Sequence, residues 1–259
     1  ENTQSFALDA QGRPRFLFQS NNVGSGVALG GAYLASCDSG CSNASQWRLS
    51  QLDENQWKNA ALAINPQGLP RIAYSMMQAA EPYAVPVISY LECGTRDCTT
   101  GVNRMTLAVT TTDGTLSTAT FAMRLTTSGA PRIALYSGTG EGGNLAANQL
   151  HYLSCDASSC TSQLNQWRAL DLGLPATHGQ EGVDLVLDGQ NRPRIALRVP
   201  VPVDELAYAW CDSACETGAP AAGSVKSSTV SSGASLSSMA RSTALRSSRT
   251  LPGQACDSR

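Results

Sequence analysis

The sequence predicts an all-β protein built from four copies of one unit of about sixty residues. Three features recur once in each unit: a turn followed by Pro-Arg, a pair of cysteines separated by four or five positions, and short apolar runs between turn-forming residues. A regular period of this length indicates one supersecondary unit that is copied and stacked. Helical periodicity is absent over any long window, so we expect the units to be built from strands.

The two motifs keep a nearly constant spacing along the chain. The turn motif occurs as Gly12-Arg13-Pro14-Arg15-Phe16, Gly68-Leu69-Pro70-Arg71-Ile72, Gly129-Ala130-Pro131-Arg132-Ile133 and Asn191-Arg192-Pro193-Arg194-Ile195. The cysteine motif occurs as Tyr33 with Cys37 and Cys41, Tyr90 with Cys93 and Cys98, Tyr152 with Cys155 and Cys160, and Tyr208 with Cys211 and Cys215. The arginines are 56, 61 and 62 residues apart, and the first cysteines 56, 62 and 56. This spacing predicts repeats at about 3–58, 59–117, 118–180 and 181–230.

Each repeat is predicted to hold four short antiparallel strands. In the third repeat these are 120–125, 132–136, 149–153 and 167–171, with apolar and β-branched or aromatic residues between Gly, Asn, Asp and Ser. Four antiparallel strands in a unit of this length are typical of a β-propeller blade. We therefore expect a propeller of four blades, or of five, with one short disulfide in each. A β-solenoid is the alternative, although its coils are usually much shorter.

The last part of the chain, residues 217–259, loses the repeat pattern. It is rich in Ser and Ala, and its charged residues before Asp257 are all basic. We expect it to supply the outer strand of the fourth blade, around 224–230, and then a degenerate half-blade or a tail. A ring that does not close would leave strand edges that invite pairing with another chain.

Four stretches carry a resemblance to a known class of repeat: Phe6-Ala7-Leu8-Asp9-Ala10-Gln11-Gly12-Arg13-Pro14, Ala61-Leu62-Ala63-Ile64, Pro70-Arg71-Ile72-Ala73-Tyr74 and Gln166-Trp167. With the cysteine pairs, they resemble the blades of secreted bacterial β-propeller proteins, whose pattern is L-A-L-D-x-x-G-x-P-x-I-A-Y, then L-x-Y-A-x-C-x-x-x-C and a Trp. The resemblance covers about residues 3–216 and implies disulfide-pinned blades. It implies no single activity, because such blades occur in lectins, lyases, adhesins and plain scaffolds.

Composition excludes some classes of partner. Of the 259 residues, only 15% are charged, and the formal net charge is −2, which gives no electrostatic reason to expect binding to nucleic acid or to an anionic membrane. No apolar run approaches the roughly 18–20 residues that cross a bilayer. The chain starts at Glu1, as expected of a mature, processed form.

The cysteines indicate the compartment. Eight of the nine form local pairs, for which we predict the disulfides Cys37–Cys41, Cys93–Cys98, Cys155–Cys160 and Cys211–Cys215. Two such pairs could instead hold a zinc ion, but the pairs are about sixty residues apart and radially arranged repeats would separate them. Disulfides require an oxidising compartment, so we expect a secreted, extracellular, cell-surface or periplasmic protein. Cys256 has no local partner and is either free, paired with a repeat cysteine, or a link between chains.

Several residues are candidates for ligand binding. The repeated Arg15, Arg71, Arg132 and Arg194 could form an anion site, for example for carboxylated sugars, or could tie each blade to its neighbour. Trp57 and Trp210 lie outside the recurring positions of Trp47 and Trp167, and are candidates for a binding surface or for packing. Glu141 lies in a Gly-rich loop and is either a site residue or a surface carboxylate.

Metal binding is a weaker hypothesis. The two histidines, His151 and His178, could together hold copper or zinc. Asp9, Asn65 and Asp188 could suggest calcium, but the turns supply few carboxylates, and these residues are common turn formers. We therefore predict no cofactor.

The function predicted from these features is a non-enzymatic binding or structural module at the cell surface. Its partner would be a surface glycan, a protein or another copy of the chain. The alternatives are a carbohydrate-binding lectin, a polysaccharide lyase or hydrolase, and a metal-binding surface protein. The sequence contains no Gly-x-Ser-x-Gly, His-Glu-x-x-His or phosphate-loop motif. Carboxylates for glycoside cleavage would come from Glu81, Glu92, Glu141, Asp184, Asp204 and Glu205.

Overall fold

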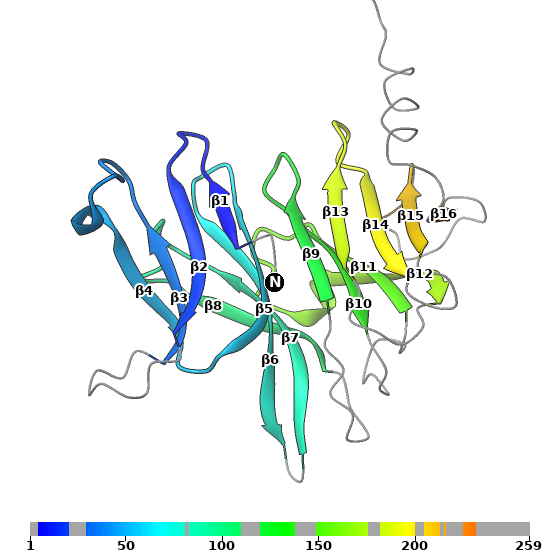
Figure 1. The fold of residues 1–259 in the computed structure, drawn as a ribbon, viewed down its shortest axis with the longest axis horizontal. Helices are drawn as coiled ribbons and strands as arrows, with labels where there is room; N and C mark the ends of the chain where they lie inside the picture. Colours follow the sequence, from blue (N-terminus) through cyan, green and yellow to red (C-terminus); the bar gives the residue numbers. More distant parts are fainter. Residues whose placement is uncertain are drawn as a thin grey trace, which may run out of the picture.

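The computed structural model describes residues 5–20, 30–80, 83–109, 120–137, 149–175, 182–199, 205–212, 215 and 225–231. These residues form four antiparallel sheets of four strands each (Figure 1). The first sheet is β1 (Phe6–Leu8), β2 (Pro14–Ser20), β3 (Gly31–Ser36) and β4 (Arg48–Asp53). The second is β5 (Trp57–Ile64), β6 (Pro70–Ala80), β7 (Tyr83–Glu92) and β8 (Asn103–Val109). The third is β9 (Thr120–Leu125), β10 (Pro131–Ser137), β11 (Gln149–Cys155) and β12 (Trp167–Pro175). The fourth is β13 (Val183–Leu187), β14 (Pro193–Val199), β15 (Glu205–Cys211) and β16 (Val225–Ser231).

Within each sheet the strands pair in the order in which they occur in the chain. Two single-turn 3-10 helices, η1 (Ala44–Gln46) and η2 (Leu164–Gln166), precede the fourth strand of the first and third sheets. The prediction of an all-β fold is confirmed. Strand β16 lies where the sequence predicts an outer strand of the fourth repeat, and residues 232–259, with the predicted half-blade or tail, lie outside the described residues.

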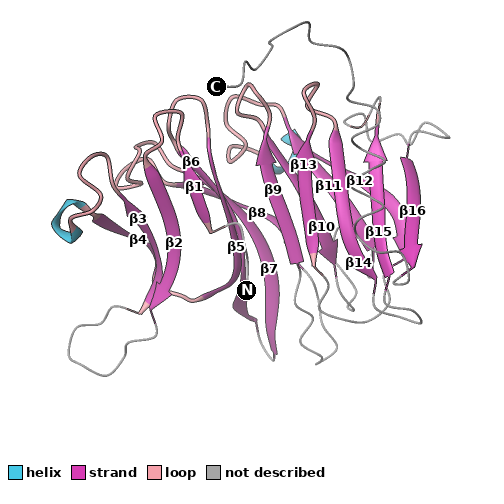
Figure 2. Ribbon diagram, turned by 45° about the horizontal axis from the view of Figure 1, so that its top comes forward, coloured by secondary structure: helices cyan, strands magenta, loops and turns pink. Residues whose placement is uncertain are grey.

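The sheets are stacked side by side in a row (Figure 2). Their first strands are neighbours in succession, because β1 contacts β5, β5 contacts β9, and β9 contacts β13. The first strands of the two end sheets, β1 and β13, make no comparable contact in the part of the chain that the structure describes. The described residues therefore show blade-like sheets in a row and not the closed ring of the predicted propeller.

Three apolar cores hold the row together, one between each pair of successive sheets. Successive side chains of a strand point to opposite faces, so a sheet in the middle of a stack must be apolar on both. Strand β6 shows this alternation: Ile72 and Tyr74 pack in the core shared with the first sheet, while Ala73 packs in the core shared with the third. The sequence satisfies the requirement because the second strand is apolar at consecutive positions.

The turn before the second strand of each sheet contains a residue in the left-handed backbone conformation, with positive φ. Gly12, Gly68 and Gly129 have φ of 73°, 79° and 90°, and the fourth turn places Asn191 there with φ of 60°. Glycine and asparagine are the residues that adopt this conformation at the lowest cost. The proline that follows begins the second strand, and its arginine is therefore held at the same strand position in every sheet.

The register of the first sheet differs from the alignment of the tyrosines. Tyr90 pairs with Ala73, and the third and fourth sheets repeat this pair, but in the first sheet the equivalent pair is Leu17 with Leu34. Tyr33 pairs instead with Phe18, one position away. Because a shift of one residue moves a side chain to the other face of a strand, Tyr33 lies on the face opposite to that of Tyr90.

Candidate functional site

All four predicted disulfides are present: Cys37–Cys41, Cys93–Cys98, Cys155–Cys160 and Cys211–Cys215. Each closes the turn after a third strand, and the last three pack in the cores between sheets. The recurring tryptophans close these turns, since the Trp47 Nε1–H donates to the Cys41 carbonyl at 3.0 Å and the Trp167 Nε1–H to the Cys160 carbonyl at 2.7 Å. Four disulfides fit an oxidising compartment and leave these cysteines unable to bind zinc as thiolates. Cys256 lies outside the described residues.

The repeated arginines make the same internal contacts in every sheet. In each, Nη1 donates to the carbonyl of the preceding proline and to that of the first cysteine, at 2.9 and 2.8 Å for Arg15 and at 3.0 and 3.2 Å for Arg132. Nη2 also pairs with a carboxylate after that cysteine in three sheets: Asp38 at 2.5 Å, Asp156 at 2.6 Å and Asp212 at 2.8 Å. These contacts join the second strand to the cysteine turn and favour a structural role. Anion binding by Arg15, Arg71, Arg132 and Arg194 stays a prediction.

Polar contacts also join the second and third cysteine turns to the sheet before them. The Arg15 Nε–H donates to the Arg96 carbonyl at 3.2 Å, and the Ser50 hydroxyl donates to the Asp97 carbonyl at 2.5 Å. At the next junction the carboxylate of Glu92 accepts from the backbone N–H of Cys160 at 3.0 Å and from the Ser159 hydroxyl at 2.9 Å. At these two junctions, the cysteine turn of one sheet therefore docks on the face of the preceding sheet that packs against it.

Glu92 has a structural role that the sequence did not reveal. It is buried, it lies 3.8 Å from the Arg71 guanidinium, and it holds the cysteine turn of the third sheet. In the other sheets this position is Ser36, Ser154 or Trp210. The only sequence signal was a carboxylate at a strand position that is otherwise uncharged.

The remaining candidates are distributed over different parts of the molecule. Trp57 is buried in the core between the first two sheets, where its ring stacks on Tyr74 at 4.1 Å between centroids, which favours packing. Trp210 is half-buried, with its ring 5.4 Å from that of Tyr208. His151 is buried on β11 opposite Leu135. His178 and Glu141 lie outside the described residues, so their roles stay predictions.

The turn carboxylates use their oxygens on the backbone. The Asp9 Oδ1 accepts from the N–H groups of Gln11 and Arg13, each at 2.9 Å, and Oδ2 accepts from the Arg13 side chain at 2.6 Å. Asn65 and Asp188 make the same pair of backbone contacts. Within the described ranges, no three His, Cys, Asp or Glu side chains are grouped to hold a metal ion. The contacts favour the turn-forming interpretation, and calcium, copper or zinc binding stays untested.

These contacts predict a stability change at acidic pH. Burial alone would raise the pKa of Asp9, but the hydrogen bonds from Arg13 and Gln11 and the charge of Arg13 outweigh it and lower the pKa from its usual 3.8. A lowered pKa adds stability above the unfolded-state value, and this stability is lost as the pH falls through the folded-state pKa. We expect Asp9→Asn, which copies Asn65, to cost about 1 kcal/mol or less at pH 7. The difference from the wild type should shrink as the pH falls below 3.8 and through the lowered folded-state pKa of Asp9.

The measurement is urea unfolding of both proteins at neutral pH and at several acidic values. Asp188→Asn is the matched variant in the fourth sheet, because the pKa of Asp188 is also lowered: hydrogen bonds from Arg192 and Gln190 outweigh its burial. A difference between wild type and Asp9→Asn that stays constant as the pH falls would contradict the assignment.

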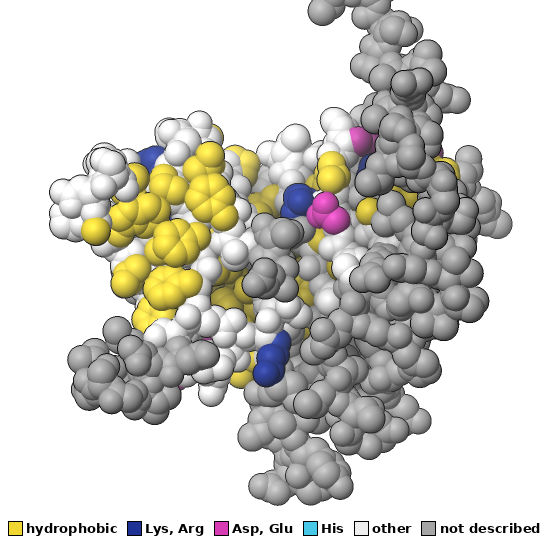
Figure 3. All heavy atoms as spheres, viewed as in Figure 1, with side chains coloured by type: hydrophobic (Ala, Val, Ile, Leu, Met, Phe, Trp, Pro, Cys, Tyr) yellow, Lys and Arg dark blue, Asp and Glu magenta, His cyan; other side chains and the backbone are white. Residues whose placement is uncertain are grey.

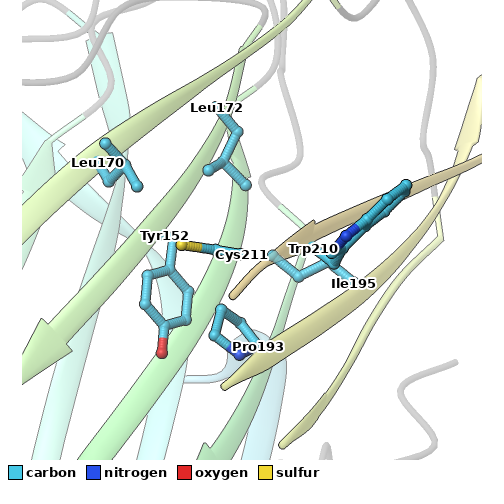
Figure 4. Close-up of a pocket in the computed structure, with 7 residues that line it drawn as sticks. All are labelled: Tyr152, Leu170, Leu172, Pro193, Ile195, Trp210 and Cys211. Carbon is cyan, nitrogen blue, oxygen red and sulfur yellow. The ribbon is translucent and has the colours of Figure 1, made fainter. Parts of the chain in front are cut away.

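One small cavity lies between the third and fourth sheets (Figure 4). It is lined by Tyr152, Leu170, Leu172, Pro193, Ile195, Trp210 and Cys211. In Figure 4 the Trp210 ring lies away from the other labelled side chains. The lining is almost entirely apolar, whereas a sugar site between blades would combine aromatic and polar groups. The cavity is therefore a packing gap in the core and does not support a lectin site.

The first sheet carries an apolar surface, which we call the outer face: the exposed Phe6, Leu8 and Leu49, the half-buried Phe16, Phe18 and Trp47, and the buried Tyr33, whose ring stacks on Phe18. Phe6, Leu8 and Leu49 are 55%, 55% and 61% exposed. The aromatic rings touch in a chain, with centroids of Phe16 and Trp47 5.3 Å apart and those of Phe18 and Tyr33 5.4 Å apart. Figure 3 shows the apolar side chains gathered over β2, β3 and β4.

The equivalent face of every later sheet is covered. Ile72 and Tyr74, the counterparts of Phe16 and Phe18, are buried against the first sheet, and Ile133 and Leu135 are buried against the second. Among the described sheets only the first has no preceding sheet, so the side chains that would form a further core are not covered by another described sheet. The outer face is the strongest candidate for a functional site in the described residues.

Comparison with protein-family models found no match to this chain, and comparison with curated proteins found none either. The helices that the structure describes are single turns, and neither is long and apolar enough to cross a membrane.

Proposed function

We propose that the protein is a non-enzymatic scaffold that binds another protein through the outer face of its first sheet. The observation that carries this proposal is the exposure of Phe6, Leu8 and Leu49 beside a connected row of aromatic rings. A contiguous exposed apolar patch on a soluble domain marks an interaction site. Aromatic side chains are also enriched at the centres of protein–protein interfaces.

We further propose that each sheet is a β-propeller blade and that the protein acts outside the cytoplasm, secreted or at the cell surface. The order of strands, the succession of first-strand contacts and one disulfide in each sheet support the blade assignment. The disulfides support the compartment. The lectin, lyase or hydrolase, and metal-binding hypotheses have no comparable support among the described residues.

The test uses the dye 8-anilinonaphthalene-1-sulfonate, which fluoresces on apolar surfaces, with protein dilute enough to be monomeric. We expect the wild type to bind the dye and Leu49→Arg to remove most of the fluorescence, because a charge placed among the rings disrupts the patch. Leu164→Arg is the matched control, since Leu164 is 47% exposed but lies on η2, away from the outer face. Equal fluorescence from Leu49→Arg and the wild type would overturn the proposal.

A further inference from the structure

We propose that the partner of the outer face is the fourth sheet of a second copy of this chain, joined head to tail. The inference rests on the proposed function, since it names the protein that the outer face binds. We call the face of the fourth sheet that points away from the third sheet the forward end face. It consists of Val186, Arg194, Ala196, Tyr208 and Trp210. Contacts at the internal junctions indicate that these two faces are complementary.

The first argument is the repeated pair of residues that packs against the next sheet. Ala73 pairs with Tyr90 in the second sheet, and the equivalent pair in the third sheet is Ala134 with Tyr152. Both pairs are buried against the face of the next sheet that corresponds to the outer face. The fourth sheet repeats the pair as Ala196 and Tyr208, but both residues are only half-buried. The forward end face thus has the residues that cover such a face elsewhere.

The second argument is the end of the sheet where the cysteine turns dock. Arg15 and Glu92 each reach the cysteine turn of the following sheet, and both are buried there. Their counterparts on the forward end face are Arg194 and Trp210, which are more exposed. In the described part of the chain, no sheet precedes the first one, so the cysteine turn between Cys37 and Cys41 has no described sheet to dock on. Within the described residues, the fourth sheet therefore keeps the arginine that receives a cysteine turn at the first junction, with Trp210 in place of the Glu92 carboxylate.

The third argument is the location of the exposed apolar side chains. The large hydrophobic residues exposed in the described ranges are Phe6, Leu8, Leu49, Leu164 and Val186. Phe6, Leu8 and Leu49 belong to the outer face and Val186 to the forward end face. Both faces are thus surfaces of the kind that oligomers bury.

The occupant is a second copy because one copy holds the two faces apart. The first and fourth sheets lie at opposite ends of the row (Figure 2). Different faces that match each other form a heterologous interface, which either closes into a ring or continues as an open assembly. Two copies closed in this way would place eight sheets in one ring, at the upper end of the range of about four to eight blades in propellers.

The experiment places one new cysteine on each face, in a Cys256→Ser background so that Cys256 cannot form the link. The first strands are neighbours at every internal junction, so Leu8→Cys on β1 and Val186→Cys on β13 should lie close together across the new junction. The two single variants are mixed, treated with a thiol-specific crosslinker and separated without reduction. We expect the mixture to give at least ten times more linked dimer than either variant alone. Intact mass confirms the four native disulfides in each variant.

Sedimentation velocity gives the second measurement. We expect the wild type to self-associate, Leu49→Arg to weaken the association about a hundredfold because it buries an unpaired charge, and Leu164→Arg to leave it unchanged. Efficient linking of Leu8→Cys to itself would show a face-to-face dimer and overturn the proposal.

Two further outcomes separate this proposal from the proposed function. A wild type that stays monomeric at all concentrations but binds the dye at the outer face would overturn the second-copy partner and leave the proposed function in place. A monomer that binds no dye, and in which the Leu8→Cys/Val186→Cys double variant links within one chain, would show ring closure and overturn both.

Discussion

Arg15→Ala should lower the free energy of unfolding by about 2 to 3 kcal/mol, because backbone carbonyls that the buried guanidinium satisfies lose their donor. The Arg15 side chain is only 1% exposed and donates to the carbonyls of Cys37 and Arg96 and to the carboxylate of Asp38. Its removal leaves buried acceptors without a donor, both within the first sheet and at the junction with the second. Urea unfolding at neutral pH, followed by far-ultraviolet circular dichroism, measures the loss.

Arg194→Ala is the matched control. Arg194 occupies the same strand position and donates to the Cys211 carbonyl and to the carboxylates of Asp188 and Asp212, but its side chain is 22% exposed and no sheet follows it in the described part of the chain. We expect a loss of about 1 kcal/mol, in the range of exposed ion pairs. Equal losses for the two variants would show that the contact with Arg96 contributes nothing. Arg15→Lys should fall between the wild type and Arg15→Ala, because lysine keeps the charge but not the planar fork of donors.

Glu92→Ala should cost about 3 kcal/mol, because it leaves the buried backbone N–H of Cys160 without an acceptor and Arg71 without its carboxylate. The same unfolding measurement detects the loss. Glu92→Gln retains an oxygen for the Cys160 N–H but not the charge, so we expect about half of the effect. A loss below about 1 kcal/mol for Glu92→Ala would contradict the view that this carboxylate holds the second and third sheets together.

The strands and disulfides could be predicted from the sequence because they depend on local patterns. The local patterns are period-two alternation, turn residues and cysteines four or five positions apart. Each of them recurs about every sixty residues, so each supports the same division into repeats. The sequence also indicated that the repeated arginines could have a structural role instead of binding an anion, since a residue present in every copy usually serves the fold of that copy. Their acceptors at Cys37, Cys155 and the other cysteine turns became visible only in the structure.

The sequence by itself determined four all-β units, each with four strands and a short disulfide. Tertiary structure decided which face of each unit is covered. Phe16 and Ile72 occupy the same motif position and are both strongly apolar, yet Ile72 is buried by the sheet before it and Phe16 lies at an end of the row. Whether a side chain is buried depends on which sheet packs against its face. The repeat pattern is the same in an end sheet as in a middle sheet, so the sequence does not tell which faces are covered. For this reason the roles of Glu92, Trp57 and the outer face became visible only once the sheets were placed against one another.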